Sequence, residues 1–316
     1  MGAPDSFLHK AMALRNQVLN LDRRSVKLAS LLDSQQKTDI SKPIIFNGYA
    51  RLHRFSEEKK PHWVLDPLPT IPALSKLHCD PSTIRDARVL QLSACNLRCW
   101  YCFVDYENLS PYSPSSKDFS VSEIISVLQS YSKEQYVIDL SGGNPGLVPE
   151  WAVWVIEELT ARNLDNVYVW IDDNLTVNFY NRFLTDNQIK TIASFPRFGS
   201  VACFKGFDET SYIFNTGLPE LFFDEQFNIF KSLFSFGWDI YGYVTLTTPS
   251  SKDLHNKIQI FINRLQDIDP ILPLRVIPLE IRPYTPTKSR MTKIHEESMA
   301  NQYKALDFWI SELEMA

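Results

Sequence analysis

The sequence contains no hydrophobic run near the ~20 residues that a membrane-spanning helix needs, so we expect no membrane anchor. Residues 1–17 have no basic stretch followed by a continuous apolar core, which argues against a secretory signal. Cysteine is scarce: the chain has 5, an odd number, and three are clustered, so a disulfide framework is not expected. These absences predict a protein of the reducing cytoplasm.

Positive charge is not in excess either. The 32 basic residues are outnumbered by 37 acidic ones, and the net charge of −5 makes a nucleic-acid partner unexpected. The 6 histidines show no metal-ligand spacing, and no repeat or low-complexity tract is visible. A hydrophobic content of 44% and a charged content of 22% are typical of a folded globular chain.

What the sequence does have is a dense group of cysteines. Cys95, Cys99 and Cys102 follow a C-x3-C-x2-C spacing. Thiolates at this density usually hold a metal, because sulfur is the soft ligand that iron–sulfur clusters and zinc prefer. Three thiolates are one short of the four that fill an ordinary [4Fe–4S] cluster, and no fourth cysteine lies nearby. We therefore predict a cluster with one iron open to a ligand that is not part of the protein.

With Tyr101 just before the last cysteine, this stretch resembles the signature of radical S-adenosylmethionine (SAM) enzymes. The resemblance implies that the three cysteines bind three irons of a [4Fe–4S] cluster and that SAM chelates the fourth. It also implies that one electron, from an external donor such as flavodoxin or ferredoxin, cleaves SAM to a 5′-deoxyadenosyl radical that abstracts hydrogen from the substrate. A zinc knuckle, or three unrelated core cysteines, is the alternative.

Strand and helix patterns alternate from residue 88 onward, which predicts an α/β fold with βαβ units and a parallel sheet. Six repeats match the open (β/α)6 partial TIM barrel of the resembled family. We expect an N-terminal extension over 1–84, the barrel core over 85–291 and a C-terminal helix within 292–316. The expected strands are 89–93, 136–140, 167–171, 200–204, 240–246 and 274–281.

The first 84 residues match no family that we can name. Residues 5–35 are predicted to form one or two helices, in which Leu28, Leu31 and Leu32 make the clearest apolar stripe. Residues 36–80 are rich in proline, so we expect them to be irregular and wrapped on the core. Cys79, at the end of this segment, is interpreted as a buried or incidental thiol, with an auxiliary metal ligand as the alternative.

Each predicted strand alternates polar and apolar residues, although a closely packed parallel barrel should have strands that are apolar on both faces. Helices need an apolar surface, so we expect the apolar faces to point outward. Buried polar groups without partners are unfavourable by ~1–3 kcal/mol each, which predicts an interior that is wet and binds a polar ligand. Exposure on an open sheet is the alternative. The residues expected to face inward are Gln91, Ser93, Asp139, Ser141, Tyr168, Trp170, Asp172, Cys203, Lys205, Tyr241, Tyr243, Thr245, Thr247, Glu280 and Arg282.

Three further elements are candidates for contact with SAM. Gly142, Gly143 and Asn144 follow the second strand, where the resembled family carries a Gly-Gly-Glu-Pro element whose backbone contacts the amino group of SAM. Asn144 stands where glutamate is usual, so backbone contacts are kept but a carboxylate is lost; a plain turn is the alternative. Asp172 ends the third strand with inward parity, and Thr245 is a candidate by its position on the fifth strand.

Lys205, Cys203 and Arg282 are the candidate catalytic residues. Lys205 lies in a stretch that resembles a lysine-containing element of several radical SAM subgroups, where it would contact SAM or the substrate; a surface lysine is the alternative. Cys203 would donate a hydrogen atom to a product radical, or would simply pack in the interior. Arg282 would bind a carboxylate or phosphate, or would pair with Glu280.

The predicted function is that of a radical SAM enzyme acting on a polar substrate: a sugar, a nucleotide, an amino acid or a peptide. One alternative is an activase that installs a glycyl radical on a partner protein. The element around Lys205 favours it, whereas an extension that closes the barrel mouth counts against it. Another alternative is a non-enzymatic zinc protein that binds RNA or protein. The sequence itself names no substrate.

Overall fold

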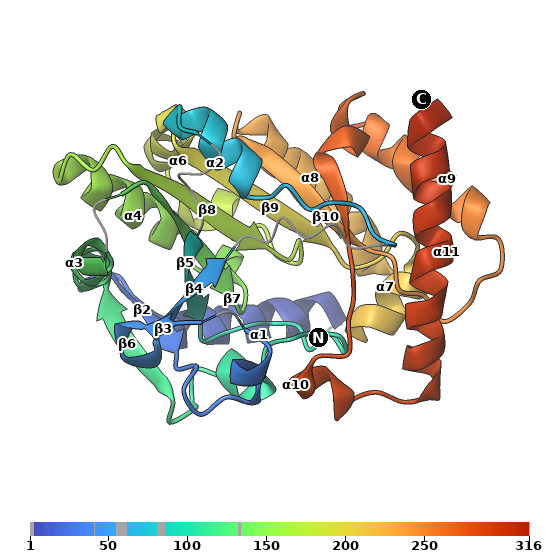
Figure 1. The fold of residues 1–316 in the computed structure, drawn as a ribbon, viewed down its shortest axis with the longest axis horizontal. Coiled ribbons are helices and arrows are strands. Elements are labelled where there is room, and N and C mark those ends of the chain that lie inside the picture. Colours follow the sequence, from blue (N-terminus) through green and yellow to red (C-terminus); the bar gives the residue numbers. More distant parts are fainter. Residues whose placement is uncertain (1–2, 41, 55–61, 81–85, 132–133, 316) are drawn as a thin grey trace.

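The computed structural model describes residues 3–40, 42–54, 62–80, 86–131 and 134–315. Its central strands are β5 Asp86–Leu92, β7 Tyr136–Gly142, β8 Val167–Asp173, β9 Phe198–Phe204, β10 Ile240–Thr245 and β11 Val276–Leu279. These strands lie side by side in chain order, and each pairs in parallel with the next. The strands expected from the sequence are therefore all present, in a mixed α/β fold with a largely parallel sheet (Figure 1).

Helices alternate with these strands and pack on one face of the sheet. Helix α3 (Val121–Tyr131) begins with a capping box, because Ser120 and Glu123 hydrogen-bond each other's backbone N–H groups. Apolar helix residues such as Trp151 and Phe230 form the main buried cluster together with outward strand residues such as Leu140. The helices are α3 Val121–Tyr131, α4 Glu150–Ala161, α5 Phe179–Phe183, α6 Asp186–Ser194, α7 Glu209–Thr216, α8 Leu221–Ser235, α9 Leu254–Gln266, α10 Thr285–Lys288 and α11 Lys293–Met315.

The N-terminal region adds antiparallel strands to the same sheet. After α1 (Ala3–Val18), strand β2 (Ser25–Ala29) follows, so the helix predicted from the spacing of Leu28, Leu31 and Leu32 is wrong. β4 (Ala50–Arg54) pairs antiparallel with β5, and β2 meets the end of β5 at Leu92. The remaining elements are β1 Leu19–Asn20, β3 Ile44–Ile45, β6 Ser116–Ser120, and the 3-10 helices η1 Gln35–Thr38, η2 Phe46–Gly48, η3 Tyr106–Leu109, η4 Pro145–Leu147 and η5 Leu272–Arg275.

Residues 36–80 are also more regular than expected, since they include β3, β4 and the helix α2 (Thr70–Leu77). Leu74 and Leu77 of α2 pack in a second buried cluster with Val137 and Tyr168, which lie in the amino-terminal halves of their strands. This helix lies across the end of the sheet away from α10 (Figure 1). Cys79 is half-buried beside the same cluster. An apolar plug therefore fills one end of the sheet's second face.

This second face, opposite the main helix cluster, is called the inner face below. The strand register places Arg51, Val89 and Asp139 in one row across β4, β5 and β7. In the next row toward the carboxyl ends, Gln91 pairs with Ser141. The predicted alternation is thus confirmed for these strands, but the polar residues occupy only the carboxyl-terminal half of the face.

For the last strand the predicted alternation is wrong. Ile277 of β11, expected to point outward, packs against the inner cluster, and its register partner on β10 is Tyr243. Glu280 and Arg282, expected to point inward, lie beyond the end of the strand at Leu279. The strand is shorter than the apolar run that predicts it, so the alternation was counted over residues that belong to a loop.

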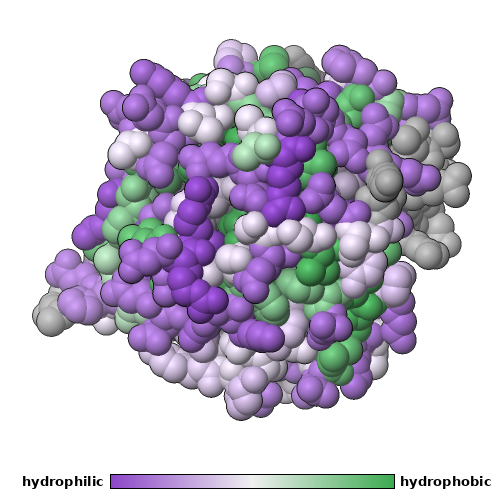
Figure 2. Space-filling model, turned by 90° about the vertical axis from the view of Figure 1, so that its left-hand side faces the viewer, coloured by the Kyte–Doolittle hydropathy of each residue, from purple (hydrophilic) through white to green (hydrophobic). Residues whose placement is uncertain are grey.

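The outer surface is mostly polar. Seen from the side that carries α3, the molecule shows hydrophilic residues with small, separate hydrophobic areas between them (Figure 2). Exposed apolar side chains such as Leu21 and Tyr112 are scattered, which is normal for a folded chain. In the described part of the chain, no helix combines the length and the apolar character needed to cross a membrane.

The apolar plug gives the first testable prediction. Leu74→Ala should lower the free energy of unfolding by about 2–4 kcal/mol, because Leu74 is 7% exposed and its removal leaves a cavity between α2 and the sheet. Ile71→Ala on the same helix is the matched control, since Ile71 is 59% exposed and should change the free energy by under about 0.5 kcal/mol. If denaturant titrations gave the same change in unfolding free energy for both variants, α2 would not pack as described.

Candidate active site

The three cysteines lie on the loop 93–105, called the cysteine loop, at the carboxyl end of β5. Cys95 and Cys99 are each 7% exposed, and Cys102 is half-buried. Cys99 interacts electrostatically with Cys95 and Cys102, so the three thiols share one site. Burial raises the pKa of all three, that of Cys99 to about 12. A thiolate in this site therefore requires a cation or a metal beside it.

Side chains of the loop region hold the loop's own backbone. Arg98 donates to the carbonyl oxygens of Cys95 and Leu97, at 2.6 and 2.7 Å. The Tyr106 hydroxyl lies 2.8 and 2.9 Å from the carbonyl oxygens of Arg98 and Cys99. These bonds fix the direction of the loop between its first two cysteines.

The C-terminal segment holds the rest of the cysteine loop. Arg290 donates to the carbonyl oxygens of Cys102 and Val104, at 2.6 and 3.0 Å, and its guanidinium lies 3.5 Å from the centre of the Tyr106 ring. The Thr287 hydroxyl also lies 3.4 Å from the Cys102 carbonyl oxygen. Nothing local in the sequence links these residues to the cysteines, and our sequence analysis missed them.

Asn215 of α7 connects the loop to two strands. Its side-chain oxygen accepts hydrogen bonds from the Trp100 indole at 3.1 Å and from the Thr247 hydroxyl at 2.8 Å. Its amide group donates to the carbonyl oxygens of Lys205 and Thr247. Asn215 is 1% exposed, so a single buried amide ties the cysteine loop to the ends of β9 and β10.

Two predicted catalytic residues lie beside the thiols. Lys205 follows β9, and its side chain hydrogen-bonds to Cys203. Burial on its own lowers the pKa of Lys205, but Cys203, Tyr101 and Cys99 raise it well above the ordinary value. The ammonium group therefore stays charged and favours thiolates nearby; it opposes the effect of burial on Cys95 and Cys99. Lys205 is half-buried, so it is not the surface lysine of the alternative interpretation.

The predicted glycine element packs against the cysteine loop. A Cβ atom on Gly143 would lie 2.0 Å from the carbonyl oxygen of Ala94, and one on Gly142 would meet Gln91 at 1.9 Å. The Asn144 N–H donates to the Ala94 carbonyl at 2.6 Å. Glycine is thus required here because two backbone segments approach each other, a reason different from the approach to SAM that we expected.

Tyr101 and Thr245 form a direct pair. The Thr245 hydroxyl lies 3.0 Å from the Tyr101 hydroxyl, and both residues are buried. Burial raises the pKa of Tyr101 well above its ordinary value, so the phenol stays neutral. The hydroxyl of Thr245 therefore positions the ring next to the cysteines.

A second polar group lies on the inner face. Ser141 donates to Asp172 at 2.5 Å, and Asp172 interacts electrostatically with Asp139. Burial raises the pKa of both acids, that of Asp172 to about 6. Arg51 of β4 carries the opposite charge and interacts with both carboxylates. Asp172 thus lies where the sequence predicts it, whereas Arg51 was missed because strand β4 was not expected.

Arg282, a predicted catalytic residue, has surroundings unlike those of the residues above. Its guanidinium pairs with Glu280 at 2.7 Å, and its side chain is 47% exposed. Glu280 also accepts a hydrogen bond from Tyr303 of α11 at 3.1 Å. The geometry favours the structural pairing that was our alternative for Arg282.

Four buried polar side chains form a cluster, called the amide network, of which the sequence singled out only Asn144, as a candidate for contact with SAM. They are Asn96, Asn144, Asn174 and Thr176, each at most 5% exposed. Asn144 and Asn174 both donate to the Asn96 oxygen, at 3.2 and 3.0 Å, and Asn96 donates to Thr176 at 2.7 Å. Single asparagines in loops carry no spacing signal, so only the fold brings them together.

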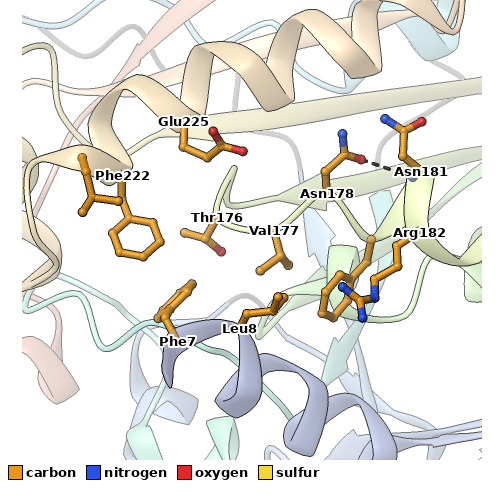
Figure 3. A pocket seen from close by; sticks show the side chains of 11 residues that line it. Phe7, Leu8, Thr176, Val177, Asn178, Asn181, Arg182, Phe222 and Glu225 are labelled. Atoms are coloured by element: carbon orange, nitrogen blue, oxygen red, sulfur yellow. Dashed lines mark hydrogen bonds between the residues drawn. The ribbon is translucent and has the colours of Figure 1, made fainter. Parts of the chain in front are cut away.

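A cavity of about 450 Å³ opens on the far side of this network. Phe7 and Leu8 of α1 face Phe222 and Glu225 of α8 across it, with Thr176 on the loop between them (Figure 3). No candidate site residue from the sequence analysis lines this cavity. Thr176 is the residue that joins its wall to the amide network.

The donor set fits a cubane iron–sulfur cluster. Three thiols come from one loop, share one site and have the Lys205 ammonium close by. A [4Fe–4S] cluster takes one thiolate at each of three irons and leaves the fourth iron for another ligand. Among the described residues, no three His, Cys, Asp or Glu side chains form a group that could hold a single metal ion.

The contact of Gly143 with the cysteine loop gives a prediction. Gly143→Ala should lower the free energy of unfolding by about 2–4 kcal/mol and reduce iron binding after anaerobic reconstitution, because the new methyl group must displace the backbone of Ala94. Gly217→Ala is the control: its φ of +71° opposes a side chain by about 1–2 kcal/mol, but nothing lies within 4 Å. Full iron binding by Gly143→Ala would contradict the close approach.

Asp173 gives a prediction on pH. Burial raises its pKa to about 7, against about 4 in an unfolded chain, so folding favours the protonated form and stability should fall as pH rises from about 4 to about 7. Asp173→Asn keeps the oxygen that accepts from Leu175 and removes this penalty. Chemical unfolding should therefore give a difference in unfolding free energy, Asp173→Asn minus wild type, that is about 2–3 kcal/mol larger at pH 8 than at pH 5. A difference that is flat with pH would refute the buried carboxyl.

Comparisons with known proteins add a distant relationship. No protein-family model matches the sequence. The chain is 39% identical over 72 residues to the 7-carboxy-7-deazaguanine synthase of Halobacterium salinarum, a radical SAM enzyme; the match covers 23% of this chain and 26% of that protein. The chain thus matches only about a quarter of that relative's length.

Among solved structures, a spore photoproduct lyase with bound AdoMet aligns at a TM-score of 0.42 and 14% identity, over 72% of this chain and 62% of that one. Streptococcus suis SuiB, bound to its precursor peptide SuiA, aligns at 0.40 and 13%, over 66% and 45%. These TM-scores are too low to transfer a function. In its C-x3-C-x2-C loop and in its local identity to a radical SAM synthase, the chain is similar to radical SAM enzymes.

Proposed function

We propose that the protein is a radical SAM enzyme that acts on a polar substrate. The observation that carries the proposal is the position of three neighbouring thiols on one buried loop at the carboxyl ends of parallel strands, where active sites of such folds lie. Cys95, Cys99 and Cys102 would hold a [4Fe–4S] cluster. When bound, that cluster would supply the electron that cleaves SAM to a 5′-deoxyadenosyl radical able to abstract hydrogen from the substrate.

In this proposal the chain's own residues bind and orient SAM and the substrate, and they exclude water. Lys205 supplies a positive charge beside Cys99 and Cys203, which suits the carboxylate of SAM or of the substrate. Tyr101, fixed by Thr245, forms a rigid wall beside it. Deeper on the inner face, Arg51, Asp139 and Asp172 offer charges of both signs to a polar molecule. These groups support a sugar, nucleotide, amino acid or peptide as the substrate class.

The proposal includes the finer fold prediction. An open (β/α)6 barrel is supported by the six parallel strands and their alternation with helices. The division into an extension over 1–84, a core over 85–291 and a C-terminal helix over 292–316 remains a prediction, as does an external one-electron donor such as flavodoxin or ferredoxin. Cys203 as a hydrogen-atom donor also remains a prediction.

Contacts at the mouth favour a small molecule or a flexible peptide over a folded partner protein. η1 reaches the inner face through Gln36, which exchanges hydrogen bonds with Gln91. The same segment contacts α10, where Asp39 accepts from Thr285 at 2.8 Å. These bonds link the N-terminal region to the segment after β11 and narrow the entrance that a partner's glycyl loop would need.

The proposal predicts that Cys99→Ala abolishes formation of 5′-deoxyadenosine from SAM. One cluster ligand is then missing, so reconstituted protein should also hold much less iron and sulfide. Cys79→Ala is the matched control, because Cys79 is half-buried beside the apolar plug and should leave both quantities unchanged. The measurements are iron and sulfide content and chromatographic detection of 5′-deoxyadenosine after reduction with dithionite.

Two outcomes would reject the proposed function. In one, wild-type protein reconstituted with iron and sulfide takes up neither, or binds zinc instead. In the other, Cys99→Ala forms 5′-deoxyadenosine as fast as wild type. If neither outcome occurs, deuterium transfer from labelled candidate substrates to 5′-deoxyadenosine would identify the substrate class.

A further inference from the structure

Asn174 makes a contact that the proposed function does not use. Its side-chain Nδ2 lies 3.8 Å from the sulfur of Cys95, within hydrogen-bonding distance for a sulfur acceptor. The backbone N–H of Leu97 donates to the same sulfur at 3.4 Å. The Cys95 sulfur therefore accepts one hydrogen bond from its own loop and one from the loop after β8.

The position of Asn174 is fixed from several sides. Its oxygen accepts from Thr176 at 2.5 Å, and its Nδ2 also donates to Asn96 at 3.0 Å. Its backbone N–H donates to the Asn144 oxygen at 3.3 Å. The next residue, Leu175, has a φ of +56° and is fully buried, and its N–H is held by Asp173 at 2.6 Å. A non-glycine residue in this conformation is strained, so the surroundings must hold the loop firmly.

We propose that Asn174 is a positioning residue that tunes the reduction potential of the cluster held by Cys95, Cys99 and Cys102. This inference rests on the proposed function, because it needs the cluster to be present. Hydrogen bonds to cluster sulfurs are among the features that set the potential of iron–sulfur centres. The N–H dipole points at the sulfur and favours the state with one more electron, so its loss makes reduction harder.

The redox step itself is simple. The oxidised cluster gains one electron from an external one-electron donor and becomes the reduced cluster, with no proton transferred to Asn174. The amide N–H stays on the nitrogen in both states. Its contribution is electrostatic, and it is larger in a buried site, where the local dielectric is low.

Asn144 provides a matched control within the same network. It is 1% exposed, donates to Asn96 at 3.2 Å and accepts from the backbone of Asn174. The structure gives it no hydrogen bond to a cysteine sulfur among the described residues. Removing its amide should therefore weaken the network much as removing that of Asn174 does, without removing a donor to sulfur.

The experiment compares Asn174→Leu and Asn144→Leu with wild type, each as full-length protein reconstituted anaerobically. Midpoint potentials come from redox titrations of the SAM-free proteins followed by electron paramagnetic resonance, because Asn144 is itself a candidate contact of SAM. Asn174→Leu should shift the midpoint to more negative values, whereas Asn144→Leu should match wild type although both lose thermal stability. Electron–nuclear double resonance should show one exchangeable proton coupling fewer in Asn174→Leu than in wild type and Asn144→Leu, while the coupling from the Leu97 N–H remains in all three proteins.

The outcomes separate this inference from the proposed function. If wild type holds a cluster and the Asn174→Leu midpoint is unchanged, the inference is wrong while the proposed function stands. If both leucine variants shift equally, the network acts through loop position alone, and the inference is also wrong. Asn174→Ser removes the amide with a smaller change in volume, and it replaces the leucine variant if that protein does not fold. Absence of a cluster in wild type would reject both proposals.

Discussion

The cysteine loop is irregular backbone placed in the interior, and buried backbone without secondary structure must find hydrogen-bond partners elsewhere. Its carbonyl groups are satisfied one after another by side chains: by Arg98 and Tyr106 from the loop region and by Thr287 and Arg290 from the C-terminal segment. Each unpaired group would destabilise the fold by about 1–3 kcal/mol. The arrangement of distant segments around the loop is therefore a direct consequence of burying it.

The same burial sets the electrostatics of the site. Thiols surrounded by apolar side chains stay protonated, as the raised pKa of Cys99 shows, unless a positive charge is brought to them. Three cations of the chain supply this charge: Lys205 acts on all three thiols, Arg98 on Cys95 and Arg290 on Cys102, and each opposes the effect of burial on the thiol pKa. Buried cations beside three thiols favour the thiolate form that a metal cluster would need. Packing and chemistry thus depend on the same loop.

The parallel core could be predicted from the sequence because its signals are local. Alternating strands, a capping box at Ser120 and the cysteine spacing each lie within a few residues, and the structure agrees with them. What could not be predicted depends on partners far away in the chain. β4 pairs with a strand more than thirty residues later, and Asn174, Asn215 and Arg290 reach the cysteines only after folding. The Leu28 stripe was misread as a helix because strand and helix spacings overlap in short segments.

The N-terminal region also completes the charge balance of the inner face. Arg51 of β4 lies in one row with Val89 and Asp139, and its guanidinium interacts electrostatically with the Asp139 carboxylate. A buried carboxylate without a cation nearby is strongly unfavourable, and Asp139 and Asp172 already share one end of the face. A unit that began at residue 85 would keep both acids and lose Arg51, so the pKa of both acids would rise further. The strand that local patterns could not reveal is thus the one that brings a cation to two buried acids.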